Sequence, residues 1–165
     1  MSKKSLLGSI EPMSLFMEEL PSFLGEVNEV TGDVYFGNNK LRTLINSPRI
    51  VKGDFYCANN RLKSLEGAPH HIGGWLDVTH NRLQTLKGCP TFIGGGFVCR
   101  ANNLRSLVGA PRILKGTLDC HNNPLESLDG CPVEIGGNCW LPKNNHFDEE
   151  DIRARCNGIG SIIFV

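Results

Sequence analysis

Apolar residues recur along this chain with a fixed period of 21 residues. One copy of the repeated phrase, L-x-V-x-x-N-x-L-x-x-L, runs from Leu76 to Leu86. Its asparagine recurs at Asn39, Asn60, Asn81, Asn102 and Asn123. Between copies lies a second phrase that carries a proline and, five residues later, a glycine. A repeat of this length predicts coils that stack on one another, because one coil cannot bury its apolar face alone.

Each copy contains a short stretch in which apolar residues alternate with others, as at Leu76 and Val78. Period-two alternation predicts a strand, and identical strands at a fixed spacing are expected to pair in parallel from coil to coil. The asparagine is expected to turn the chain out of the strand, while its amide satisfies buried backbone groups of adjacent coils. The rest of each coil leaves little room for a helix, so irregular or 3-10 segments are predicted on the outer face.

The repeat predicts one structural domain with three parts: an N-terminal cap at 1–24, a solenoid at 25–147 and a C-terminal cap at 148–165. In the first cap, residues 13–20 are expected to form a short amphipathic helix that Pro21 ends. In the second, an acidic start, late arginines and an Asn-Gly pair predict a capped helix, followed by a closing strand.

The last repeat is interpreted as shifted by one residue. Trp140 and Asn145 are aligned one position beyond the 21-residue register, and Pro142 takes an inward position. This alignment places Cys139 and Leu141 in solvent-facing rows. Terminal copies of solenoids are usually atypical, which favours such a departure.

With its asparagine and leucines in this order, the phrase resembles the leucine-rich repeat family over roughly residues 30–147. The resemblance implies a leucine-rich-repeat-like solenoid whose curved parallel sheet binds other proteins on its concave face. The spacer G-x-P-x-x-I-x-G resembles short repeats of bacterial and bacteriophage proteins. A bacteriophage-type module implies a host protein as partner, such as a defence factor, that the solenoid blocks or redirects.

The same spacer is also close to the short repeats of secreted bacterial ubiquitin-ligase effectors. Those proteins carry a separate catalytic domain with a cysteine after the repeats, whereas this chain stops shortly after its last copy. We therefore expect no such activity here.

Composition and charge limit the kinds of partner and the cellular location that we expect. The chain has 165 residues, 40% of them apolar, and a formal net charge of zero, so no global charge favours nucleic acid or membrane. No run of about 18 apolar residues predicts a membrane span, and the apolar stretch after Lys4 is too short for a signal peptide. Three of the seven cysteines occupy one inward position, which indicates free buried thiols and a cytoplasmic location, the host cytoplasm if the chain is phage-encoded.

A binding surface is predicted on the solvent side of the strands, where the residues between the buried ones face outward. Its members are large aromatic and charged residues, mostly from the first coils. They are Tyr35, Tyr56, Trp75, Asp54, Asp77 and Arg100. Exposed aromatics ringed by charges are typical of an interaction hot spot. The alternative is that the tyrosines form a cross-strand ladder that only stabilises the sheet.

A second candidate surface lies on the turn just after each asparagine, where basic residues recur. It consists of Lys40, Arg42, Arg61, Lys63, Arg82 and Arg105. Stacked strands lie about 4.8 Å apart, so these cations are expected to be neighbours that attract an anion or nucleic acid. The alternative is a solvated edge that keeps the protein soluble.

Catalysis and metal binding are not expected. His80, His121 and Asp119 approach one another through the repeat, with Cys139 on a nearby row, but no nucleophile motif accompanies them. The cysteines lack C-x-x-C spacing, so no metal or other cofactor is predicted. The sequence predicts a non-catalytic module that binds another protein, with anion or nucleic-acid binding as the alternative.

Overall fold

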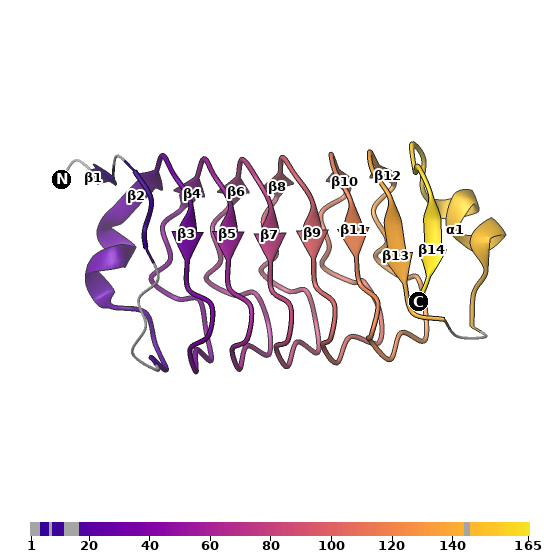
Figure 1. The fold of residues 1–165 in the computed structure, drawn as a ribbon, viewed down its shortest axis with the longest axis horizontal. Helices are drawn as coiled ribbons and strands as arrows, with labels where there is room; N and C mark the ends of the chain where they lie inside the picture. Colours follow the sequence, from indigo (N-terminus) through magenta and orange to yellow (C-terminus); the bar gives the residue numbers. More distant parts are fainter. Residues whose placement is uncertain (1–3, 7, 12–16, 144–145) are drawn as a thin grey trace.

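The computed structural model describes residues 4–6, 8–11, 17–143 and 146–165. The coils of the chain follow one another along the long axis of the molecule, and each end of the stack carries a cap (Figure 1). The predicted repeat solenoid is confirmed: successive coils pair in parallel, 21 residues apart, with little helix.

One sheet, called sheet 1 here, runs the length of the solenoid. Its strands, in spatial order, are β3 (Val34–Tyr35), β5 (Phe55–Tyr56), β7 (Leu76–Asp77), β9 (Phe97–Val98), β11 (Leu118–Asp119), β13 (Cys139–Leu141) and β14 (Ile162–Phe164). In each of the two-residue strands the first residue is buried and the second is half-buried. The predicted alternation of inward and outward positions is therefore confirmed.

The outer face of the coils differs in detail from the prediction of irregular or 3-10 segments, because each return segment forms a second short strand. These strands make sheet 2. Its members are β1 (Lys4–Leu6), β2 (Val27–Val30), β4 (Ile50–Val51), β6 (His71–Ile72) and β8 (Phe92–Ile93), continued by the separate pair β10 (Ile113–Leu114) and β12 (Glu134–Ile135). The inward Val, Ile or Leu of the return segment is buried in the core, which brings neighbouring backbones close enough to pair.

The core between the two sheets is a stack of leucines with a buried asparagine in each coil. In the central coil, the Asn81 carbonyl oxygen accepts from the backbone N–H of Leu62 at 3.0 Å. Its amide donates to the carbonyl of Cys57 at 3.0 Å and to that of Val78 at 3.1 Å. Each asparagine thus ties its own turn to the preceding coil, as predicted.

The N-terminal cap differs from the expected helix at residues 13–20. Residues 13–16 of that helix lie outside the described residues, and residues 17–20 are not helical. A 3-10 helix, η1 (Ser22–Glu26), instead follows Pro21 directly. Proline ends a helix but also suits the residue before a helix start, because its φ is already restricted.

The C-terminal cap follows the prediction. Helix α1 (Glu149–Arg155) begins after Asp148, whose side chain accepts from the backbone N–H of Asp151 while Asp151 bonds back to the Asp148 N–H. The last strand, β14, pairs with β13 and closes sheet 1 (Figure 1). Cys139 pairs with Ile162 there, so the closing coil is two residues longer than the repeat.

The predicted one-residue shift in the last repeat is wrong for the described strand residues. Leu118 pairs with Cys139 and Asp119 with Trp140, which keeps the 21-residue register. Cys139 and Leu141 are therefore buried, and Trp140 takes the outward position. Backbone pairing with the preceding coil maintains this register, and the chain departs from it only after the strand. Asn145 lies outside the described residues.

Candidate functional site

The outward rows of sheet 1 carry the predicted aromatic and acidic residues together with Asp33, a cluster called the aromatic–acidic face here. It comprises Tyr35, Tyr56 and Trp75 together with Asp33, Asp54 and Asp77. The rings of Tyr35 and Tyr56 stack on neighbouring strands, with centroids 4.9 Å apart and planes 11° from parallel. Each tyrosine hydroxyl donates to the aspartate two residues earlier, at 3.1 Å for Asp33 and 2.7 Å for Asp54.

The aspartates also join the coils. Asp33 accepts from the backbone N–H of Asp54 at 2.8 Å, and Asp54 accepts from that of Trp75 at 2.7 Å. The hydrogen bond to Asp54, with burial, raises the pKa of Tyr56, so the phenol stays protonated and keeps donating. These contacts favour the ladder that was the alternative reading of the tyrosines. The same contacts hold both rings in one position, which prepares a rigid surface for a partner.

Trp75 extends this surface and is its most exposed ring, with 42% of its area accessible. The indole covers the next coil at Gly95 and Gly96, and a Cβ on Gly96 would lie only 2.3 Å from the ring. Glycine at this row position leaves the space that the indole occupies. Trp75 is therefore both exposed and held against the backbone.

Asp77 and Arg100, the other two charged members of the predicted site, lie on the same side of the sheet and form no salt bridge with each other. Asp77 is half-buried and accepts from the backbone N–H of Thr79 at 2.8 Å. Arg100 is exposed on the following coil and forms no salt bridge within the described part of the chain. The face thus carries three aspartates that accept backbone N–H groups, and the next coil adds Arg100, a cation without a salt bridge among the described residues.

Trp140 is a surface residue that the sequence interpretation missed. It continues the outward row of Tyr35, Tyr56, Asp77, Val98 and Asp119. On its other side it pairs with Ile163 of the closing strand. The signal was present in the sequence, since position 140 lies 21 residues after Asp119. The aromatic rings therefore occur at both ends of sheet 1.

Four of the six predicted basic residues do come together. Arg42, Arg61, Lys63 and Arg82 line a hollow of about 300 Å³, called the basic hollow here. The carboxylate of Glu18, from the N-terminal cap, lies 3.5 Å from Arg42 and 4.0 Å from Arg61. Lys63 and Arg82 have no salt bridge among the described residues. One side of the hollow is thus partly neutralised and the other is not.

The remaining two residues of the predicted stripe do not belong to the hollow. Lys40 donates its backbone N–H to the carbonyl of Met17 at 2.8 Å, which attaches the N-terminal cap to the first coil. Arg105 forms a salt bridge with Glu126 of the next coil. The stripe is therefore divided into a cap contact, a hollow and an ion pair.

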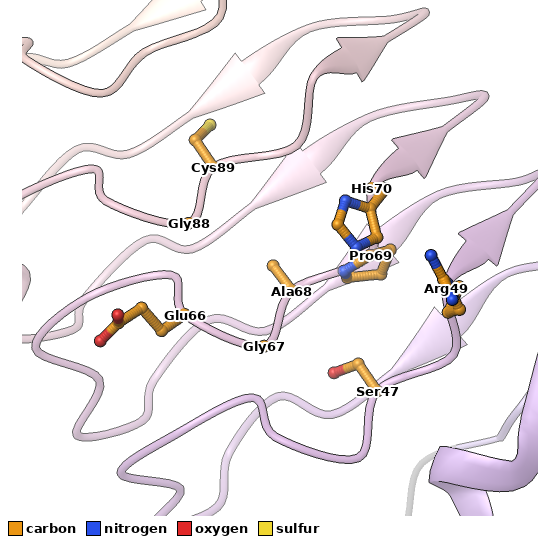
Figure 2. A pocket seen from close by; sticks show the side chains of 9 residues that line it. All are labelled: Ser47, Arg49, Glu66, Gly67, Ala68, Pro69, His70, Gly88 and Cys89. Carbon is orange, nitrogen blue, oxygen red and sulfur yellow. The ribbon is translucent and has the colours of Figure 1, made fainter.

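A second hollow, of about 390 Å³, opens beside sheet 2 between the first coils. Figure 2 shows Glu66 at one end and Arg49 at the other, well apart, with Gly67, Ala68, Pro69 and His70 between them. Burial raises the pKa of its Cys89 to about 12, so that thiol is protonated and a poor nucleophile. The polar groups do not converge on one point, and the hollow lacks the arrangement of a catalytic site.

The cysteine–histidine grouping is not assembled. Cys139, expected on an exposed row, is buried, and burial raises its pKa to about 12. His121 instead contacts Asp119, with its Nδ1 2.5 Å from the carboxylate. No group of three or more His, Cys, Asp or Glu side chains within the described ranges could hold a metal ion.

The fold and these surfaces define the class of the molecule: a capped parallel β-solenoid of 21-residue coils that presents an aromatic–acidic face and a basic hollow. Among the described residues, neither helix has the length and apolar character needed to cross a membrane. No family model matches the chain, and no curated protein or solved structure matches it. Membership of the leucine-rich repeat family stays a prediction.

Proposed function

We propose that this solenoid is a binding module that recognises a partner protein through its aromatic–acidic face, with Trp75 as the central contact. The observation that carries the proposal is that Trp75 is 42% exposed and yet held against the next coil by its contacts with Gly95 and Gly96. An exposed aromatic ring that is already ordered loses little conformational entropy when a partner covers it. Such rings are enriched among the residues that dominate binding energy.

The charges around Trp75 indicate the kind of surface that fits it. Asp77 and the stacked tyrosines lie on one side, so a partner that offers an apolar side chain flanked by a cation would complement the face. Arg100 on the following coil would then meet an acidic group. The host protein that the bacteriophage resemblance implies stays a prediction.

The test is capture of proteins from a lysate of the encoding organism by the wild-type chain and by two variants. Trp75→Ala removes the proposed contact. Phe92→Ala is the matched control, because Phe92 is 40% exposed but lies on sheet 2. We expect a protein that the wild type and Phe92→Ala retain and that Trp75→Ala loses, with a dissociation constant raised at least tenfold, about 1.4 kcal/mol. Retention by Trp75→Ala at wild-type affinity would contradict the proposal.

The basic hollow supports a second candidate function, binding of a phosphate-bearing anion. The observation that favours it is Glu18, whose carboxylate already lies beside Arg42 and Arg61 as an anion would. A ligand phosphate would compete with Glu18 for these two arginines and would also reach Lys63 and Arg82. Arginine and lysine are the usual phosphate ligands in proteins.

Glu18→Gln and the double change Lys63→Ala with Arg82→Ala test this candidate in opposite directions. With a single-stranded oligonucleotide as probe at low salt, we expect severalfold tighter binding for Glu18→Gln and severalfold weaker binding for the double variant. Lys87→Ala is the control, since Lys87 is exposed and already paired with Glu66 at 2.8 Å. Equal affinity in all four proteins, or affinity that does not fall with added salt, would exclude the hollow as an anion site.

A further inference from the structure

Two cysteines that lie far apart in the sequence meet at the C-terminal end of the solenoid. Cys131 is half-buried in the last regular coil, and Cys156 is buried at the C-terminal end of α1, with 4% of its area exposed. Their sulfur atoms are 2.8 Å apart. This contact is well inside the usual separation of sulfur atoms that only touch, and only about 0.8 Å beyond the length of a disulfide bond.

Backbone hydrogen bonds hold both cysteines in this position. The N–H of Cys156 donates to the carbonyl of Ile152 at 3.0 Å. The next residue, Asn157, bonds to the last coil through its N–H to Val133 and its carbonyl from Ile135. The N–H of Cys131 donates to Leu128 at 2.9 Å within its own turn. The two thiols therefore meet because the cap docks on the last coil.

We infer that Cys131 and Cys156 are a disulfide-forming site, which takes a low-molecular-weight disulfide as its oxidant and covalently locks the C-terminal cap onto the last coil. The site is a dithiol in the reduced protein. It is independent of the partner-binding face and of the basic hollow, since none of their residues takes part.

The chemistry is thiol–disulfide exchange in two steps. The thiolate of Cys156 attacks one sulfur of the oxidant, forms a mixed disulfide and releases one thiolate of the oxidant. Cys131, after losing its proton, attacks the Cys156 sulfur and releases the second thiolate. Two protein thiols are oxidised, one disulfide is reduced to two thiols, and the two protons pass to the departing thiolates.

The surroundings of the pair favour this order of attack. The hydrogen bond between the two thiols lowers the pKa of Cys156, with a smaller contribution from Arg155, and the same bond together with burial raises the pKa of Cys131. Burial raises the pKa of the other five thiols: Cys57, Cys89, Cys99, Cys120 and Cys139. The one thiol–thiol hydrogen bond that the structure records within its described ranges is that between Cys131 and Cys156. Oxidation is therefore directed to this pair.

The bond would act on the most vulnerable part of a solenoid, its end. Terminal coils have a neighbour on one side only, so they open before the middle of the stack. A bond between positions 25 residues apart would keep the C-terminal end of α1 attached to the turn of the last coil that holds Cys131. Oxidised protein should unfold at a higher temperature than reduced protein, because the cross-link restricts the unfolded chain.

The experiment compares the full-length reduced chain before and after incubation with oxidised glutathione. We expect the loss of two hydrogen atoms in the intact mass, one cross-linked peptide pair that contains Cys131 and Cys156, and a rise of several degrees in Tm that dithiothreitol reverses. Absence of a cross-link, or a cross-link between other cysteines, would overturn the inference on the wild-type protein alone.

Cys131→Ser and Cys89→Ser form the matched pair of variants. Both cysteines are half-buried and occupy the same position in their coils, 42 residues apart. We expect Cys131→Ser to abolish the rise in Tm on oxidation and Cys89→Ser to leave it unchanged. A rise that survives Cys131→Ser would show that the stabilisation comes from another group.

Discussion

At the scale of single residues, the buried asparagine of each coil forms hydrogen bonds with backbone groups that an apolar residue could not satisfy. Its amide and carbonyl satisfy backbone groups of two successive coils, as Asn81 does for Leu62, Cys57 and Val78. An apolar side chain of similar size would leave these groups buried without partners, and each would cost about 1–3 kcal/mol. The polar position in an otherwise apolar phrase is thus a requirement of the backbone.

Asn81→Ala is therefore expected to lower the free energy of unfolding by about 3 kcal/mol or more. Urea denaturation followed by circular dichroism measures this loss. Asn103→Ala is the control, because Asn103 is exposed directly after the ladder asparagine Asn102, and its change should stay within about 0.5 kcal/mol. A loss of similar size in both variants would show that the buried hydrogen bonds are not the cause.

At the scale of strands, neighbouring coils decide what a side chain can do. Trp75 precedes β7 and covers Gly96, which precedes β9 one coil later. The same row position holds an aspartate in the first two coils, where it accepts a backbone N–H instead. The aromatic–acidic face therefore depends on the order in which coils are stacked.

Gly96→Ala should displace the Trp75 ring, because the new Cβ would lie 2.3 Å from it. In a Trp140→Phe background, Trp75 is the single tryptophan, so its fluorescence reports the change. We expect red-shifted emission and stronger quenching by acrylamide. Gly37→Ala is the control, since its Cβ would approach no closer than 3.3 Å to the carbonyl of Ala58. Unchanged emission in Gly96→Ala would contradict the proposed packing of the indole.

At the scale of the whole molecule, the stack is close to one-dimensional, and each coil contacts mainly the coils before and after it. The pairing keeps a spacing of 21 residues from β3 to β13. When one whole coil is removed, the coils on its two sides can therefore pair with each other in the same register.

Deletion of residues 103–123 removes one full period and leaves the aromatic–acidic face, the basic hollow and both caps in place. We expect this protein to fold cooperatively with a lower Tm. Deletion of residues 103–122 leaves one residue too many at the junction, which turns the following side chains to the wrong face. That protein should lose cooperative unfolding in calorimetry. Similar melting curves for the two deletions would refute the role assigned to the register.

The inward leucines, the asparagine ladder, the strands of sheet 1 and the C-terminal helix follow from the sequence by itself. The first three depend on the period and on contacts between equivalent residues, so counting 21 positions is enough to find them, whereas the helix follows from its acidic first turn and late arginines. The predicted tyrosine cluster follows for the same reason. Trp140 could have been found by that count.

Only the tertiary structure decided the pairing of the return segments and the contacts between the caps and the repeats. The strands of sheet 2 form because the backbones of the return segments come within hydrogen-bonding distance, which side-chain pattern does not reveal. Glu18 meets Arg42 and Arg61, and Cys131 meets Cys156, because non-repeating caps dock on the ends of the stack. Contacts between a cap residue and a repeat residue do not recur at a fixed spacing, so the sequence pattern does not predict them. The packing of the cap in three dimensions sets its path.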